Sequence, residues 1–513
     1  FPVRVLGRSP LHNLLVQSAT ANGHILVIVQ MAGGNDGLNC VIPYNDPNYT
    51  SLRPTLGLKT SDNILPLPDH NSLALHFNMS GAHDLYSNKR MAILQGVGYP
   101  NPDLSHFRGT DIWNTSTDSN LYATTGWVGR FLYQLNPSYP PAQIPAGSAP
   151  LAIEFGAALS NVFLSKNGGM GIAINQLPTK ANASTHNYDA IPSNPTTPYQ
   201  ELEYVRTIQQ ETEVYSATLL GRSVTSNKVT YPTDNPLGAQ LSQVAQCIAS
   251  GFSTKIYLVY QGGYDTHSNQ LTDQAKNLQD LSDAFKAFQD DLEALGVADN
   301  VLTMTYSEFG RRPKENGSGT DHGTAAPLFV FGTQVNAGVY GNDPALDSAS
   351  LTAGSGNLTF QSDHDFRNIY ATMMYEWLLD GSDADKMTLV DNVLTASDGS
   401  TYSANTAWKH LGIVKQGTGS VSYSDAPGLM LLENYPNPVS ASTSIEYVLP
   451  DAMAVQLGIF NTGGVEVDRI VDTREEAGPH YVTFNAKNLP SGNYLYRLQT
   501  PVGTITKSMV IVK

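Results

Sequence analysis

Carboxylate and imidazole side chains lie at the ends of four apolar segments of this sequence. Asp265 and His267 stand two residues apart after the run KIYLVYQ, and Glu308 follows the run VLTMTY. Both side-chain types bind divalent metal ions, and uncompensated carboxylates at one place repel one another unless a cation lies between them. The pattern therefore predicts a metal site. The full set of these groups is Asp36, Asp265, His267, Glu308, Asp321 and His322.

Asp36 and Ser105 each have two interpretations. Asp36 follows paired glycines at the end of an apolar run, where it is either a metal ligand or the cap of the next helix. Ser105 and His106 follow a proline-rich turn and begin a predicted helix. A hydroxyl at a helix N-terminus suits a nucleophile or an anion ligand, because the positive end of the dipole lies beside it. An N-cap is the other interpretation of Ser105.

Short apolar runs bounded by polar residues predict the strands that position these groups, and amphipathic segments predict the helices between them. This alternation indicates an α/β domain with a mostly parallel sheet and helices on both faces. Ligands of such sheets bind in the crevice beyond the carboxyl ends of the strands. The predicted strands are 24–31, 91–97, 255–261, 301–306 and 327–331, and the predicted helices include 237–250, 269–295 and 365–379.

Composition limits the classes of function. The chain has 513 residues, enough for two or more domains, and a formal net charge of −16. This negative charge argues against nonspecific binding of nucleic acid or anionic lipid. No run approaches the roughly 20 apolar residues of a membrane span. Cys40 and Cys247 allow one intramolecular disulfide or remain two buried free thiols.

The pattern changes twice along the chain. Residues 115–235 are rich in Pro and Asn and irregular, which predicts an insertion or cap within an α/β domain of residues 1–414. That insertion is the expected place for substrate selection. A Gly- and Ser-rich linker, 415–428, follows. Regularly spaced, alternating strands then predict a small Ig-like β-sandwich over 429–513.

Residues 24–380 carry a series of motifs in a fixed order. They resemble the alkaline phosphatase and sulfatase-like superfamily, and more closely a secreted bacterial family of unknown function within it. The resemblance implies an alkaline-phosphatase-like core. The motifs are GGNDGLNCVIPYNDPNY, LRPTLGL, LQGVGYPNPDLSHFRGTDIW, TGWVGR, GGYDTH, SEFGRR and TDHGTAAP.

That resemblance implies a metal-dependent hydrolase of phosphate or sulfate esters. Two divalent ions of Zn, Ca or Mg would lie at the strand ends, with Ser105 as the nucleophile and Arg311 or Arg108 contacting the oxygens of the transferred group. The implied ligands are Asp36 and Glu308 for one ion, and Asp265, His267 and His322 for the other.

One position departs from the superfamily pattern. Glu308-Phe309 stands where the superfamily usually has Asp-His, so one metal position lacks an imidazole. This departure predicts a harder ion such as Ca²⁺ or Mg²⁺ there, or no ion. The alternative function is therefore a non-catalytic surface protein or assembling subunit that keeps its β-sandwich as a docking module and contacts itself or a surface partner.

The C-terminal segment resembles the type A sorting domain of type IX secretion cargo. The residues that carry this resemblance are LLENYPNPVSASTSIEYVLP, AGPHYVTFNAKNLPSGNYLYRL and the terminal KSMVIVK. It implies a secreted or cell-surface protein whose partners are the type IX translocon and a surface sortase.

Overall fold

The computed structural model separates into two compact units, residues 1–415 and 416–513, and each is described here by itself. The described residues are 23–139, 149–178, 214–215, 225–381, 383–394, 408–415, 430–431, 434, 439, 442–449, 452–461, 465–475 and 478–512.

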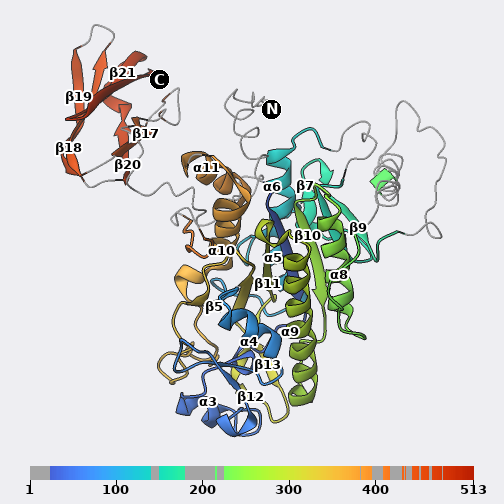
Figure 1. The fold of residues 1–513 in the computed structure, drawn as a ribbon. Helices are drawn as coiled ribbons and strands as arrows, with labels where there is room; N and C mark the ends of the chain where they lie inside the picture. Colours follow the sequence, from blue (N-terminus) through green and yellow to red (C-terminus); the bar gives the residue numbers. More distant parts are fainter. Residues whose placement is uncertain are drawn as a thin grey trace, which may run out of the picture. The chain divides into compact units, whose positions relative to one another are not determined.

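An eight-stranded sheet forms the centre of the first unit (Figure 1). Its middle strand, β1 (Ile25–Met31), is buried along its whole length. All its side chains except that of Gln30 are apolar, as is typical of a parallel strand covered on both faces. It pairs in parallel with β10 (Ile256–Gln261) and with β11 (Val301–Tyr306). The carboxyl ends of these three strands therefore meet at one edge. The full strand order is β15-β5-β14-β11-β1-β10-β6-β9.

Strand β14 (Ala326–Phe331) gives the sheet its mixed character. It runs antiparallel to both of its neighbours, β11 and β5 (Met91–Val97). The start of β14 consequently lies at the edge where β5 and β11 end. The residues before β14 thus reach the same edge as those after the parallel strands. The short strand β15 (Gly338–Tyr340) pairs in parallel with β5.

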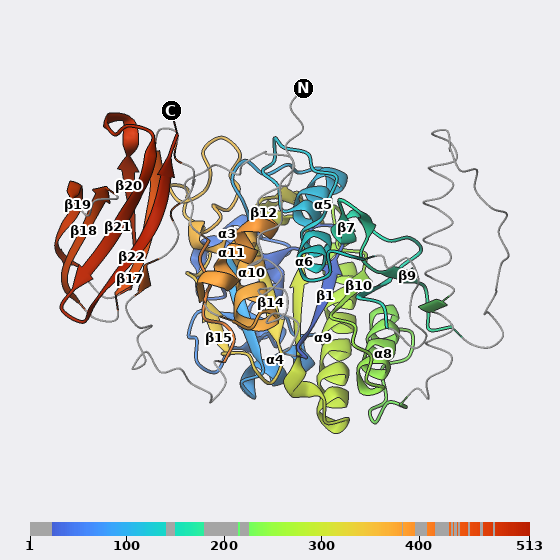
Figure 2. The ribbon, with the colours of Figure 1, turned by 90° about the horizontal axis from the view of Figure 1, so that it is seen from above.

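Helices cover both faces of the sheet (Figure 2). Apolar stripes along the helices pack against the sheet. In α9 (Gln270–Ala294), for example, Leu278, Phe285 and Phe288 are fully buried. The predicted α/β fold is thus confirmed. One face carries α4 (Ser80–Ser87), α8 (Pro236–Ala249) and α9 (Gln270–Ala294), and the other carries α5 (His106–Thr115), α6 (Trp127–Leu135), α10 (Phe366–Thr372) and α11 (Asp383–Leu394).

Part of the interval 115–235, predicted as an insertion or cap, belongs to the sheet instead. Strands β6 (Ala152–Phe155) and β9 (Ile172–Ile174) extend the sheet beyond β10. The sequence concealed β6 because Glu154, which is buried, interrupts its apolar run. Glu154 accepts hydrogen bonds from the Tyr260 hydroxyl and from the backbone N–H of Ser160. The remainder at 140–148, 179–213 and 216–224 lies outside the described residues.

The two cysteines are free buried thiols rather than a disulfide. Cys40 lies in the short helix α2 (Gly37–Cys40), with its sulfur 3.7 Å from the sulfur of Met79. Burial raises the pKa of both thiols to about 12, so neither is a thiolate near neutral pH.

The second unit is all β, as predicted. Its strands form two antiparallel sheets, β16-β17-β20 and β19-β18-β21-β22. Alternate side chains face a separate core that includes Leu457, Ile459 and Tyr496. The predicted linker 415–428 lies outside the described residues except for Lys415. The strands are β16 (Met430–Leu431), β17 (Ser442–Leu449), β18 (Met453–Asn461), β19 (Glu466–Glu475), β20 (Gly478–Asn485), β21 (Gly492–Thr500) and β22 (Gly503–Ile511).

Within the described parts of the chain, every helix is too short or too polar to cross a lipid bilayer.

Candidate metal centre

A small β-hairpin stands between β11 and β14 at the sheet edge. Strands β12 (Gly310–Glu315) and β13 (Thr320–Gly323) pair in antiparallel fashion and place Arg311 opposite His322. The two backbones approach closely, since a Cβ atom on Gly323 would lie 2.4 Å from the carbonyl carbon of Arg311. Glycine at this position therefore allows the pairing that brings His322 to the site.

Asp265 follows β10 and forms the middle of the site. Its Oδ1 atom accepts a hydrogen bond from Arg311 Nη2 at 2.7 Å and lies 2.8 Å from His267 Nδ1. Partial burial alone would raise the pKa of Asp265, but the hydrogen bond and charge of Arg311, with His322 and His267, lower this pKa to about 2. Asp265 is therefore a carboxylate at any neutral pH.

Arg311 is a fixed internal charge. Its side chain has no exposed surface, and its donors bind the carbonyl oxygens of Gly34 at 2.8 Å and Thr320 at 2.7 Å, besides Asp265. All three nitrogens of its guanidinium are thus engaged within the protein. This arrangement favours a role for Arg311 in positioning Asp265. It does not favour the role that the family resemblance implies, in which Arg311 contacts a transferred group.

His322 presents one ring nitrogen to Asp265. Its Nδ1–H donates to the carbonyl oxygen of Leu104 at 2.7 Å, which leaves the lone pair on Nε2. That Nε2 lies 3.4 Å from Asp265 Oδ1. Burial, together with the nearby charge of Arg311, lowers the pKa of His322, against the hydrogen bond to Leu104 and the negative charge of Asp265, both of which favour the protonated ring. A neutral imidazole with a free Nε2 is the form that binds a metal ion.

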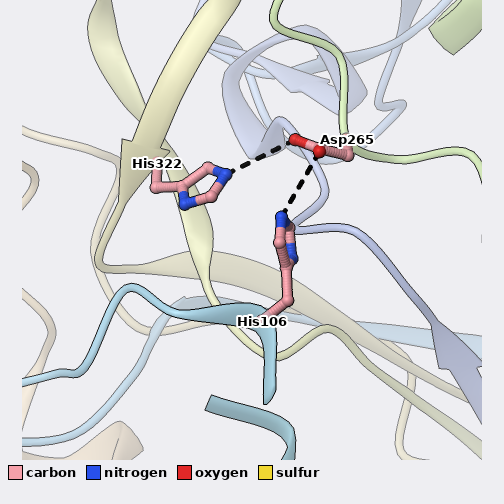
Figure 3. A group of neighbouring side chains, drawn as sticks. All are labelled: His106, Asp265 and His322. Atoms are coloured by element: carbon pink, nitrogen blue, oxygen red, sulfur yellow. Dashed lines mark hydrogen bonds and ion pairs between the residues drawn. The ribbon is translucent and has the colours of Figure 1, made fainter. Parts of the chain in front are cut away.

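His106, the first residue of α5, also points a ring nitrogen at Asp265 (Figure 3). Its Nδ1–H donates to Glu308 Oε1 at 2.7 Å, and its Nε2 lies 3.4 Å from Asp265 Oδ2. That Nε2 atom is buried and has no hydrogen-bond partner among the described residues. The two imidazoles thus direct their lone pairs at the two oxygens of one carboxylate.

This geometry fits a divalent ion. One ligand atom from each of His106, Asp265 and His322 lies within 4.8 Å of the others. Two nitrogen lone pairs facing a carboxylate repel it unless a proton or a metal cation lies between them. Two imidazoles and one carboxylate are the donor set of catalytic zinc sites, which keep a position open for substrate. The residues present therefore fit the group that the sequence pattern predicts.

Glu308 contacts the His106 ring at Nδ1, the nitrogen that faces away from Asp265. Its side chain is 2% exposed, and Oε1 also accepts the backbone N–H of Gly33 at 2.8 Å. The carboxylate thus fixes the tautomer and orientation of His106. Phe309 packs on the same ring, with centroids 4.9 Å apart. A Cβ atom on Gly34 would lie 2.4 Å from Phe309 Cε2, so the phenyl ring fills the space beside Gly34.

The Asp36 carboxylate binds residues outside the cluster. Its carboxylate forms a salt bridge of 2.5 Å with Arg53, and neither side chain has exposed surface. It also caps α2 by accepting the N–H of Leu38 at 3.3 Å, and it accepts a hydrogen bond from Gln270. These contacts match the helix-cap interpretation, and the structure does not place Asp36 in the cluster around Asp265.

Ser105 and Arg108, predicted as nucleophile and oxygen contact, are not members of the cluster. Ser105 is the exposed N-cap of α5, and its hydroxyl does not bond the helix. Arg108 binds Asp111 and the carbonyl oxygen of Ser119 at 3.1 Å, and it covers the Tyr122 ring at 4.0 Å. These contacts hold Arg108 against its own helix and the segment that follows it.

Two predicted groups border the site. His267 contacts Asp265 but is not one of the three clustered ligands. Asp321 accepts a hydrogen bond from Asn316 at 3.2 Å and lies outside the cluster.

His106 is the candidate ligand that sequence reasoning missed. The sequence places it correctly at a helix start after β5, but the hydroxyl of the neighbouring Ser105 is the group to which it assigns a function. The position of His106 could have identified it: His106 follows β5, which ends at the same edge of the sheet as the other strands that carry predicted site residues.

Family comparisons agree with the two parts of the sequence. Residues 176–384 match a family described as "Protein of unknown function (DUF1501)". Residues 433–512 match the "Secretion system C-terminal sorting domain". The predicted sorting domain is thereby confirmed, as is the resemblance to a bacterial family of unknown function. The chain is a secreted or cell-surface protein. No curated protein sequence matches it significantly.

Solved structures show distant likeness only. A protein in the alkaline phosphatase superfamily from Vibrio parahaemolyticus is 9% identical, with a TM-score of 0.32 over 93% of this chain and 88% of that chain. The PsFucS1 sulfatase from Pseudoalteromonas sp. is 10% identical, with a TM-score of 0.30 over the same shares of the two chains. PorZ of the Porphyromonas gingivalis type-IX secretion system is 20% identical, with a TM-score of 0.13. The match covers 20% of this chain and 14% of PorZ. None of these likenesses indicates a shared activity.

Proposed function

We propose that this secreted protein, which combines a DUF1501 region with a C-terminal sorting domain, is a metal-dependent hydrolase of phosphate or sulfate esters. The observation that supports the proposal is the convergence of His106 Nε2 and His322 Nε2 on the two carboxylate oxygens of Asp265. Partners proposed for the sorting domain are the type IX translocon and a surface sortase.

His106, Asp265 and His322 would hold one divalent ion. Because two of the three donors are imidazoles, a transition ion such as Zn²⁺ fits better than Ca²⁺ or Mg²⁺, which prefer oxygen ligands. When bound, such an ion supplies Lewis-acid polarisation of an ester oxygen and neutralises negative charge on the transferred group.

The surrounding residues hold the ligands in position. Glu308 and the carbonyl oxygen of Leu104 keep both imidazoles in the tautomer with a free Nε2. Arg311 holds Asp265 ionised and fixed. Glu308 would orient the ligand His106 and would not itself be a ligand. Phe309 occupies the space beside His106. The centre would therefore hold one ion rather than two.

Ser105 is the proposed nucleophile. It directly precedes His106, its hydroxyl is exposed, and it stands at the N-terminus of α5, where the helix dipole favours an anionic group. The Ser105 oxygen would form a bond to phosphorus or sulfur while the ester bond to the departing alkoxide breaks, and the proton lost by Ser105 would pass to that alkoxide to give the alcohol. Water would then release the phosphate or sulfate and regenerate the hydroxyl.

Turnover of a panel of aryl phosphates and aryl sulfates by the metal-loaded full chain tests this function. We expect Ser105→Ala to lose turnover while keeping its bound metal. Ser80→Ala is the matched control, because Ser80 is an exposed serine at the start of α4 on the other face of the sheet. Metal-loaded protein that hydrolyses no ester of either class contradicts the hydrolase and supports the non-catalytic surface subunit.

A further inference from the structure

Two exposed aromatic rings stand at and near the start of α5. Phe107 and Tyr122, at 91% and 74%, are the most exposed large hydrophobic side chains among the described residues of the first unit. Phe107 directly follows the candidate ligand His106 and stands two residues after Ser105. A single exposed hydrophobic side chain needs no explanation. Two of them next to the same functional residues indicate a surface that a ligand covers.

The loop that carries Tyr122, between α5 and α6, is held in place by two buried arginines. Arg108 donates to the carbonyl oxygens of Asp118, at 3.3 Å, and of Leu121. Arg367 forms a salt bridge with the carboxylate of Asp118. The two arginines are 9% and 6% exposed. The position of the Tyr122 ring is therefore set before a ligand arrives, which lowers the entropic cost of binding.

Arg108 is in turn connected to the central sheet. It binds the carboxylate of Asp111, which accepts a hydrogen bond from Asn161 Nδ2 at 2.8 Å. Asn161 Oδ1 accepts from Asn114 Nδ2 at 2.8 Å, and Asn114 Oδ1 accepts from the Tyr306 hydroxyl at 3.0 Å. Tyr306 is the last residue of β11, the strand that leads into the metal centre. One hydrogen-bonded framework thus positions the aromatic loop relative to that centre.

The charge on one side of the Tyr122 ring limits the ligand. The guanidinium carbon of Arg108 lies 4.0 Å from the ring centroid. Because Arg108 is buried and Tyr122 is exposed, the guanidinium covers one face of the ring and solvent reaches the other. A second cation on the open face would be repelled across the ring by the first. A neutral ring stacks there without this repulsion.

We propose that Phe107 and Tyr122 bind a neutral ring with an apolar face in the alcohol part of the ester. This inference rests on the proposed function, because the alcohol part of the substrate is the part that the metal centre and Ser105 leave outside the reacting group. Aromatic and saturated rings both present such a face. Esters of small alkyl alcohols lack it and should bind more weakly, so the two side chains determine specificity and take no part in the chemical step.

Titration calorimetry of the Zn²⁺-loaded full chain with phosphonates, whose carbon–phosphorus bond an ester hydrolase leaves intact, tests the proposal. The set is phenyl-, cyclohexyl-, methyl- and 2-aminoethylphosphonate, with the matching sulfonates. We expect a ring compound to bind about tenfold tighter than its methyl counterpart, and Phe107→Ala and Tyr122→Ala each to remove most of this advantage. Phe77→Ala, which removes an exposed ring from the segment before α4, is the matched control and should keep it.

Tighter binding of the phenyl compound than of the cyclohexyl compound identifies an aromatic ring, and equal affinities identify any apolar ring; both support the proposal. If Tyr122→Ala disturbs its loop, Phe107→Ala decides, because Phe107 is almost fully exposed. Equal affinities for methyl and ring compounds, tightest binding of the 2-aminoethyl compound, an advantage that survives in both variants, or no binding at all overturns it, even where aryl esters are hydrolysed. Ring binding that depends on both side chains, without turnover of any ester, would instead contradict the hydrolase alone.

Discussion

At the scale of single residues, the site depends on which nitrogen of each histidine carries the proton. His106 and His322 each donate Nδ1–H to a fixed oxygen, on Glu308 and Leu104, and so present Nε2 to Asp265. A carboxylate or carbonyl behind a ligand histidine raises its basicity and fixes its orientation. Glu308, which the family resemblance assigns as a metal ligand, contacts His106 Nδ1 instead of belonging to the cluster around Asp265.

Glu308→Gln tests that role. The amide keeps the size of the side chain but removes the negative charge that holds the His106 Nδ1–H. We expect metal affinity to fall by about 10- to 100-fold, the usual effect of losing such a partner. Titration calorimetry with Zn²⁺ measures this, and Glu293→Gln on the surface of α9 is the control. Complete loss of binding would instead indicate that Glu308 is a direct ligand.

Acid should destabilise the first unit partly through His76. This side chain is buried, and burial lowers its pKa from 6.5 to about 4. The unfolded chain therefore binds the proton more readily, and folding stability is lost as pH falls from 6.5 to about 4. The loss is at most roughly 3 kcal/mol. Denaturant unfolding across this pH range should show a shallower decline for His76→Leu than for wild type. Equal slopes would contradict this.

At the scale of elements, the hairpin β12–β13 connects the buried sheet to the site. Arg311 and His322 are paired across it, so one element sets both the charge that fixes Asp265 and the second imidazole. Gly323 permits the close approach of its two strands. The hairpin is therefore the element whose distortion should affect stability and metal binding together.

Gly323→Ala should have both effects. The added methyl group would meet the Arg311 backbone, so we expect a loss of about 1–3 kcal/mol of stability and weaker metal binding as His322 moves. Thermal unfolding and metal titration measure the two. Gly262→Ala, whose Cβ would have no heavy atom within 4 Å, should change neither. A stable Gly323→Ala variant with normal affinity would show that the hairpin does not position the ligand.

Much of this level of organisation is predictable from sequence, and the exceptions have physical causes. The apolar runs predict β1, β5, β10 and β11 because buried parallel strands need apolar side chains on both faces. An apolar run also predicts β14, but periodicity does not reveal strand direction, so its antiparallel pairing was not predicted. A buried, hydrogen-bonded Glu154 concealed β6, and the pairing of polar residues in β12 and β13 depends on contacts distant in sequence.

The same reasoning explains the outcome at the site. Strand-end position identified Asp265 and His322, which the structure brings together with the unassigned His106. It could not exclude Asp36, because the salt bridge to Arg53 joins segments whose contact only the fold reveals. The internal contacts of Arg311 and Arg108 are likewise invisible in a sequence.

At the scale of the whole molecule, the two units have separate hydrophobic cores, and that of the first unit comprises two clusters. Units with their own cores unfold as separate cooperative transitions. We expect calorimetry of the full chain to show two transitions, of which Zn²⁺ raises only that of the first unit. At a free concentration of 100 Kd the gain is roughly 2.7 kcal/mol. A single transition, or a metal-induced shift of both, would contradict this.

The most direct test of the central claim is the amount of divalent metal bound per chain after gentle purification, measured by elemental mass spectrometry. If His106, Asp265 and His322 hold one ion, wild type should retain about one equivalent, Asp265→Asn should retain almost none, and Asp321→Asn should match wild type. Metal-free wild type that also takes up no ion on titration, or an Asp265→Asn variant that binds as wild type does, would contradict the claim.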